Sequence, residues 1–221
     1  MDSMKYLILI VMIVGVPGIY WGILRWNQPY FEMEQNRNRK LMKTKGEVLV
    51  LSLSEIAALK LWYQYQNENL SGMFLSLLYT NLLLLTILCM TDIWEKRVPN
   101  RILLLGGTVC FLETGFWAVK DLAYVVRILP SMFLGFLFCL FSFGISYLIS
   151  RGSMGSGDVK LSLILGLFLT GEYVVRIVFY GCLISALYSL IQLFRKKLSR
   201  KDEIPFVPFL YIGMIFVYLT E

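Results

Sequence analysis

Apolar residues run in eight segments along this chain, separated by short polar stretches that hold most of its charges. A helix needs roughly 20 apolar residues to cross a bilayer, and most of the segments approach that length. The pattern therefore predicts an all-α fold, a polytopic membrane bundle of about eight transmembrane helices. The predicted spans are 6–24, 48–65, 72–90, 102–119, 125–149, 161–171, 174–194 and 206–220.

The composition of the chain also indicates a membrane protein. Of its 221 residues, 57% are apolar and only 16% are charged, whereas a soluble domain is about 45–50% apolar and about 25% charged. The mean hydropathy is +0.66. These values exclude a cytosolic globular domain, a disordered chain and a coiled coil.

Three of the apolar segments need comment. The segment 48–65 is the weakest, since it holds Glu55 and Lys60, and 161–171 is short enough to indicate a re-entrant or tilted turn. The first segment has no small-residue cleavage site and runs into Trp21 and Trp26. We therefore expect it to be a retained span and not a signal peptide.

The distribution of positive charge predicts the orientation of the bundle. Sixteen of the 21 Lys and Arg residues fall in 25–46, 91–101, 150–160 and 195–204. The positive-inside rule places these stretches in the cytoplasm, and both chain ends outside. The bias depends on 48–65 being a span, because otherwise the basic stretches on its two sides would face opposite ways. The net charge of +6 then needs no nucleic-acid partner.

The stretch 25–46 is the longest polar segment, rich in Asn, Gln, Arg and Lys. We expect a basic cytoplasmic loop that contacts anionic membrane lipid or docks a partner protein. Residues 1–71 then form an N-terminal part of spans with this loop, and residues 72–221 form a membrane core.

The cysteines do not suggest a metal site. Cys89, Cys110, Cys139 and Cys182 are scattered inside apolar runs, and the chain has no histidine. A zinc site needs clustered Cys, His or carboxylate ligands, so no zinc or other metal is expected. A mechanism with a histidine base is also excluded, and the cysteines fit small buried hydrophobes.

Two aspartates stand at predicted span ends on the cytoplasmic side. Asp92 ends the third apolar segment, and Asp158 closes a Gly-Ser-Gly-Asp run before the sixth. Charged groups in or near a bilayer are costly and tend to be functional, although Asp158 could simply cap a helix that starts at Val159. Asp92 could likewise be an ordinary boundary carboxylate. Gly155 and Gly157 would allow positive φ angles and the close approach of another chain, which suits a site that admits a peptide backbone.

Two carboxylates in a poorly solvated pocket cannot both ionise cheaply, so they share a proton and their apparent pKa values split. The ionised member can take a proton from water while the neutral member polarises a peptide carbonyl. This is the chemistry of aspartic proteases, and it needs no metal, histidine or nucleophilic serine.

Three blocks occur in a familiar order. Asp92 is followed by Val98-Pro99-Asn100, a Gly-Ser-Gly-Asp-Val-Lys-Leu run covers 155–161, and an Ile-Pro-Phe-Val-Pro-Phe-Leu run covers 204–210. Across about 50–221 the chain resembles bacterial prepilin peptidases, which belong to the Gly-x-Gly-Asp intramembrane aspartyl proteases. It departs from their third block at one position, where Val207 replaces glycine.

The resemblance implies an endopeptidase that removes short basic leader peptides from type IV prepilins or pseudopilins. The cut follows a glycine at the cytoplasmic face of the bacterial inner membrane, and Asp92 and Asp158 are the catalytic pair. Lys160 is a candidate for tuning this pair through its charge, or is a plain interfacial lysine.

The resemblance also suggests supporting residues. Glu55 falls where the family has a glutamate in its second span, and Pro99 belongs to the first block. Pro205, with Pro208, is expected to shape the entrance of the last span rather than to contact substrate.

Larger family members differ from this chain over 25–46. They carry two C-x-x-C pairs in that cytoplasmic domain, and many methylate the new pilin N-terminus with S-adenosylmethionine. This chain has no cysteine before Cys89, so the peptidase is expected to need no cofactor or zinc, and use of S-adenosylmethionine stays open.

Two other readings are compatible with paired aspartates. A signal-peptide-peptidase-like protease cuts within a span, but its aspartates lie deeper, in Tyr-Asp and Gly-x-Gly-Asp contexts, whereas Asp92 follows a threonine. A non-enzymatic transporter coupled to protons or cations would place its carboxylates near mid-span, and these lie at span ends.

Overall fold

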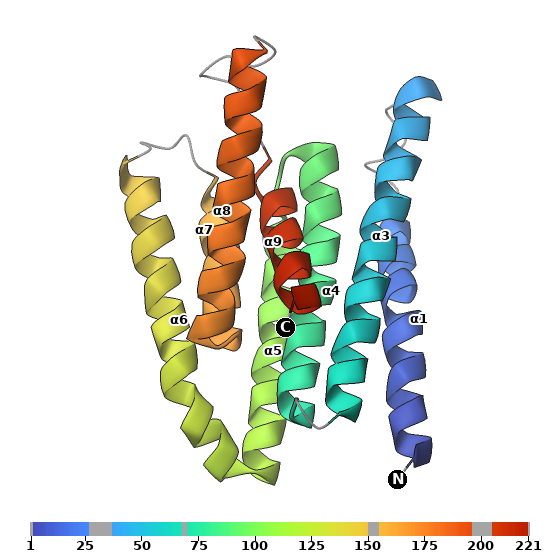
Figure 1. Cartoon of the computed structure of the whole chain (residues 1–221), viewed down its shortest axis with the longest axis vertical. Helices are drawn as coiled ribbons and strands as arrows, with labels where there is room; N and C mark the ends of the chain where they lie inside the picture. The colour runs from blue at the N-terminus through green and yellow to red at the C-terminus, as the bar shows by residue number, and fades with distance from the viewer. Residues whose placement is uncertain (1, 27–36, 68–69, 150–154, 196–204, 221) are drawn as a thin grey trace.

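A computed structural model describes residues 2–26, 37–67, 70–149, 155–195 and 205–220. These residues form helices that run alternately up and down one bundle, and they contain no strand (Figure 1). The prediction of an all-α fold is confirmed. The helices are α1 Asp2–Trp26, α3 Arg37–Gln66, α4 Gly72–Glu95, α5 Asn100–Lys120, α6 Leu122–Ile149, α7 Ser156–Phe168, α8 Gly171–Phe194 and α9 Val207–Thr220.

Among the described residues, four helices are long and apolar enough to cross a membrane, by length and composition. They cover Gly72–Trp94, Asn100–Lys120, Leu122–Ile149 and Gly171–Phe194. The chain is therefore a helical membrane protein. The helices α7 and α9 have 13 and 14 residues, which is about 20 Å each and shorter than the roughly 30 Å hydrocarbon core of a bilayer.

The helix α3 begins earlier than the apolar pattern predicted. It starts at Arg37, so the second half of the stretch predicted as a basic loop is helical, while residues 27–36 lie outside the described residues. Long Arg, Lys, Leu and Met side chains favour a helix even without an apolar stripe, so hydrophobic periodicity alone misses this start.

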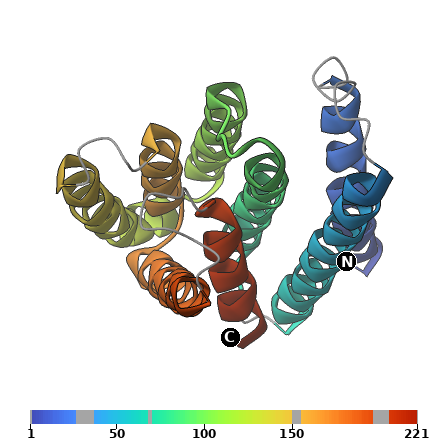
Figure 2. The same ribbon diagram turned by 90° about the horizontal axis from the view of Figure 1, so that it is seen from above.

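The helix α4 forms the centre of the bundle. Within its apolar window 72% of the residues are buried, against 11% for α5. It packs against α3, α5 and α9, and Figure 2 shows α1 and α3 together on one side of the remaining helices. Its core residues include Leu82, Leu85 and Leu88, which are fully buried.

A buried polar cluster joins α3 to α4 and α9. The Ser54 hydroxyl lies 3.0 Å from Thr86 Oγ1 and 2.9 Å from Tyr211 Oη. The Tyr211 hydroxyl also donates to the carbonyl of Val50 at 2.7 Å. Because such groups would lack partners in hydrocarbon, their mutual hydrogen bonds fix the register of α3.

Glycines allow two helix pairs to approach at backbone distance. A methyl group added at Gly166 of α7 would lie 2.7 Å from the Gly135 carbonyl oxygen of α6. One added at Gly213 of α9 would lie 2.6 Å from the Ile177 carbonyl oxygen of α8. Small residues at such contacts are typical of membrane helix packing. These pairs fix α7 and α9, whose first turns lie beside the candidate site.

The connection between α7 and α8 lies at membrane depth. Its Leu169 is fully buried, and the Gly171 N–H donates to Ser131 Oγ of α6 at 3.2 Å. Ser131 stands nine residues after Leu122, the first residue of α6, which is about 14 Å along that helix. Irregular backbone is tolerated inside a bilayer only where protein groups satisfy it, and the Ser131 hydroxyl does so here.

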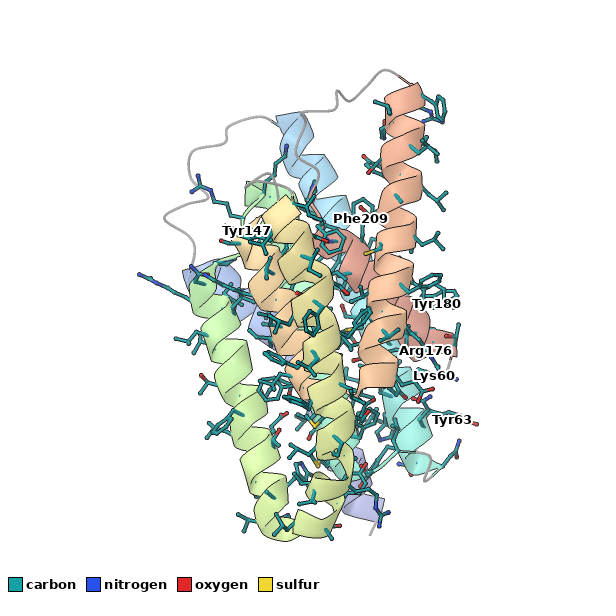
Figure 3. All side chains as sticks on the ribbon, turned by 90° about the vertical axis from the view of Figure 1, so that its left-hand side faces the viewer. Lys60, Tyr63, Tyr147, Arg176, Tyr180 and Phe209 are labelled. Atoms are coloured by element: carbon teal, nitrogen blue, oxygen red, sulfur yellow. The ribbon has the colours of Figure 1, made fainter. Side chains whose placement is uncertain are left out.

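The basic residues Lys60 and Arg176 fall inside predicted spans. Figure 3 shows Lys60 and Arg176 in the lower half, and Phe209 and Tyr147 toward the upper end. Arg176 forms an ion pair with Glu172 one turn earlier in α8, which offsets its charge at that depth.

Candidate active site

Asp92 lies in the last turn of α4 and is only 5% exposed. The helix ends at Glu95, and Lys96 follows in the left-handed region at φ 52° and ψ 37°, with its N–H donating to the Asp92 carbonyl. The chain then turns through Pro99, which precedes the first residue of α5. This tight turn holds the Asp92 side chain at the end of the bundle, below the α4–α5 connection.

The start of α9 supplies a hydrogen-bond donor to Asp92. The Val207 N–H donates to Asp92 Oδ2 at 3.1 Å. The first N–H groups of a helix have no partner within it, and the helix dipole adds partial positive charge there. Pro205 leads the chain into α9, and neither Pro205 nor Pro208 has an N–H to offer. This hydrogen bond favours negative charge on Asp92 and acts against the cost of burying that charge.

Gly157 brings the start of α7 against the α4–α5 connection. A methyl group added at Gly157 would lie 2.7 Å from Val98 Cβ, and one at Gly155 would lie 3.2 Å from Asp158 Oδ2. The expectation of positive φ at these glycines is wrong for Gly155, whose φ is −65°, and for Gly157, which is helical. Glycine is needed here for close packing, because any Cβ would push Asp158 away from α4.

The two aspartates act on each other electrostatically. Burial raises the pKa of Asp158 to about 6, and the negative charge of Asp92 adds to this rise. Asp158 is partly exposed in the first turn of α7. The end of α4 and the start of α7 lie at the same end of the bundle (Figure 1). The fold thus brings together two carboxyl groups that are 66 residues apart.

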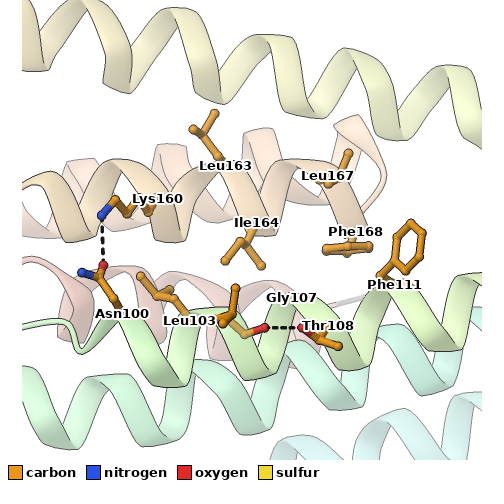
Figure 4. Close-up of a pocket in the computed structure, with 11 residues that line it drawn as sticks. Asn100, Leu103, Gly107, Thr108, Phe111, Lys160, Leu163, Ile164, Leu167 and Phe168 are labelled. Atoms are coloured by element: carbon orange, nitrogen blue, oxygen red, sulfur yellow. Dashed lines mark hydrogen bonds between the residues drawn. The ribbon is translucent and has the colours of Figure 1, made fainter.

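Two predicted site residues, Lys160 and Glu55, have other partners than the two aspartates. The Lys160 Nζ donates to Asn100 Oδ1 of α5 at 3.0 Å (Figure 4), and the influences resolved on Asp158 are burial and Asp92. The charge of Glu55 interacts with Tyr79. Tyr79 precedes Asp92 by 13 residues of α4, which is about 20 Å along the helix, so Glu55 lies away from the two aspartates.

Sequence analysis did not predict three interactions at or near the site. The Val207 N–H binds Asp92, the charge of Lys96 acts on Asp92, and Asn100 binds Lys160. A proline-flanked helix start in the third block was a usable signal for Val207. No motif pointed to Lys96 or to the bond between Asn100 and Lys160.

The described residues contain no group of three or more His, Cys, Asp or Glu side chains that could hold a metal ion. The site that the structure does assemble consists of two carboxyl groups, a backbone N–H and a nearby ammonium group. Such a set can hold one proton between two acids and position a water molecule.

Comparison with known proteins agrees with this chemistry. A model of the type IV leader peptidase family matches residues 79–190, which is half of the chain and includes Asp92 and Asp158. The chain therefore belongs to the type IV leader peptidase family. This assignment does not favour the signal-peptide-peptidase-like and transporter readings.

A prepilin leader peptidase/N-methyltransferase of Bacillus subtilis (strain 168) is 30% identical over 139 residues. The aligned part is 62% of this chain and 52% of that protein, so the chain spans about half the length of this curated relative. No solved structure matches the chain.

Proposed function

We propose that this protein is a prepilin leader peptidase, an aspartyl endopeptidase that removes the basic leader from type IV prepilins or pseudopilins after a glycine. The observation that supports this best is the convergence of Asp92 and Asp158 within the family segment. Lys160, Pro99 and Pro205 support the site from its edges, and Glu55 lies outside it.

The two carboxyl groups would divide the work. In this mechanism Asp158 would be the acid, because burial and the charge of Asp92 raise its pKa to about 6. Asp92 would be the base, because it accepts a hydrogen bond from the Val207 N–H. Asp92 takes a proton from water while Asp158 polarises the scissile carbonyl. The water oxygen adds to that carbon, the C–N bond breaks, and the leaving amine receives a proton.

The proposed location is the cytoplasmic membrane of a bacterium, with several spans and both chain ends outside. The site lies where α4 ends and α7 begins (Figure 1). The sequence stretches 91–101 and 150–160, which the charge count assigns to the cytoplasm, border these helix ends. A basic leader would therefore meet the dyad without crossing the bilayer.

Methyl transfer is kept separate from this proposal. The Bacillus relative carries both activities in its name, but the chain spans about half of that protein. Whether this protein uses S-adenosylmethionine therefore stays open. Mass spectrometry of the mature pilin N-terminus tests it, because methylation would add the mass of one methyl group.

Co-expression with a prepilin that carries a basic leader, in a host without its own leader peptidase, tests the proposal. The wild type should shorten the prepilin on an immunoblot, and Asp92→Asn and Asp158→Asn should each leave it uncut at equal expression. Asp121→Asn is a matched control, because this exposed aspartate caps α6 away from the site. Cleavage by both dyad variants, or none by the wild type, would refute the proposal.

A further inference from the structure

An apolar groove of about 620 Å³ runs along the seam between α5 and α7. Figure 4 shows its walls, with Leu103, Gly107 and Phe111 on α5 and Leu163, Ile164 and Phe168 on α7. The hydrogen bond between Lys160 and Asn100 lies at one end. The groove is thus polar at the mouth and apolar along its length.

The groove begins at the end of α7 that carries Asp158 and follows α5 and α7 away from that end. Lys160 at its mouth is two residues after Asp158 in α7. On α5 the groove extends from Asn100 to Phe111, which is about 16 Å, and on α7 it extends from Lys160 to Phe168, which is about 12 Å. It could therefore accompany the first 8–11 residues of a helix that leaves the dyad toward the far side of the membrane.

Three neighbouring seams pack closely at particular described residues, and a second hollow of about 380 Å³ lies further from Asp158, between α6 and Leu167. Between α4 and α5, a methyl group at Gly106 would lie 2.5 Å from Leu84 Cδ1. Between α6 and α7, Gly135 and Gly166 meet at backbone distance. Between α6 and the start of α9, the rings of Phe143 and Phe206 lie 5.7 Å apart.

We propose that the groove between α5 and α7 binds the apolar helix of the substrate that directly follows the scissile bond. This inference rests on the proposed function, since it needs a substrate whose apolar segment begins at the cut. The substrate helix would insert one row of side chains into the groove, as ridges of one helix insert into grooves of others.

Gly107 offers a way to fill the groove without disturbing the dyad. A methyl group there would lie 3.7 Å from Ile164 Cδ1, which is ordinary contact, whereas a leucine side chain would occupy the space. Gly115 lies two turns further along α5, and a methyl group there has nothing within 4 Å. Gly115→Leu is therefore a matched control on the same helix.

The kinetic test uses two substrates, a full-length prepilin and a short peptide that spans the cut but lacks the apolar helix. Gly107→Leu should lower kcat/KM for the prepilin by at least about tenfold, mainly through KM, and leave peptide cleavage unchanged. Gly107→Ala and Gly115→Leu should match the wild type on both substrates. Equal loss on both substrates, or no difference between Gly107→Leu and Gly115→Leu, would overturn the groove proposal.

A binding test covers the case in which the leucine variant fails to fold or the short peptide is not cut. A photo-crosslinking amino acid is placed at Thr108, which lines the groove, or at Leu112, which is exposed on α5 outside it. In an Asp158→Asn background, position 108 should capture prepilin within the first ten or so residues after the cut. Capture of phospholipid alone at position 108, or equal capture of prepilin at 112, would overturn the proposal.

These outcomes separate the groove from the function. If the wild type cuts prepilin and Asp158→Asn does not, the peptidase proposal stands whatever the groove variants do. If the wild type cuts no prepilin, the function itself is wrong, and the crosslinks then report only an apolar binding seam.

Discussion

The end of α4 and the start of α7 present the same side chain in different surroundings. Asp92 is 5% exposed and accepts a hydrogen bond from the Val207 N–H. Asp158 is more exposed, follows Gly155 and Gly157, and has its pKa raised by burial and by its neighbour. One carboxyl group therefore has a backbone donor for its charged form, and the other has a raised pKa.

This asymmetry shows how one residue type can serve as both acid and base. A symmetric pair would leave the position of its shared proton undetermined, whereas different environments assign it. The different surroundings of the two aspartates depend on two backbone features. These are the missing Cβ of Gly157 and the Val207 N–H that donates to Asp92 at the start of α9. Each can be altered without touching either aspartate.

The largest effect is expected from Gly157→Ala. The added methyl group cannot remain 2.7 Å from Val98 Cβ, so α7 must move away from α4 and separate the two carboxyl groups. A displacement of about 1 Å costs on the order of 100-fold in rate, and prepilin cleavage by purified protein measures it. Val98→Gly in the same variant should restore part of the rate, and Gly115→Ala should have no effect. Full activity of Gly157→Ala would show that the close approach is dispensable.

A smaller loss is expected from Val207→Pro, which removes the N–H that Asp92 accepts. Proline is tolerated in the first turn of a helix, so α9 should form. A hydrogen bond to a charged group contributes about 1.5–3 kcal/mol, which corresponds to a loss of about tenfold or more in kcat. Pro208→Ala keeps the Val207 N–H and should be near wild type; equal losses in both variants would instead indicate damage to α9.

The pH dependence of stability tests the raised pKa of Asp158. Its pKa is about 6 in the folded protein, raised from 3.8, so the folded state binds more protons than the unfolded state between these values. The contribution of Asp158 to the free energy of unfolding should therefore fall as pH rises from about 4 to about 6, and level off above. Melting curves in detergent should show this fall in the wild type relative to Asp158→Asn. A constant difference across that range would contradict the raised pKa.

The smallest effect is expected from Lys160→Gln. Lys160 binds Asn100 at an exposed position, and such a contact contributes little, so kcat/KM should change less than about threefold. Asn100→Ala should behave alike, and the double variant should be no worse than either. A shift of the pH–rate profile in Lys160→Gln alone would show that its charge does tune the dyad.

The sequence predicted which two acidic residues the fold brings together better than it predicted their surroundings. The motif spacing identified Asp92 and Asp158, and the charge count placed them at the same membrane face. The Val207 donor carried no side-chain signal, because every residue other than proline has a backbone N–H and only the fold selects one. The glycines were singled out for backbone freedom, whereas contacts across the chain explain Gly157.

Helix positions were predicted where apolarity marks them and missed elsewhere. The start of α3 at Arg37 lies in a basic run, and α7 begins at Ser156, before the predicted segment 161–171. Nor could apolarity distinguish α4 at the centre from α5 at the periphery. In a bilayer, core-facing and lipid-facing positions are both apolar, so the periodic signal that marks a soluble core is lost.

The connection between α7 and α8 has a consequence for the opposite end of α7, where Asp158 lies. The Gly171 N–H donates a hydrogen bond to Ser131 of α6, and this bond restrains the end of α7. Together with the close contact between Gly135 and Gly166, this bond holds α7, and with it Asp158, in position against α6. Ser131 of α6, which lies far from both aspartates, thus helps to position the helix that carries Asp158.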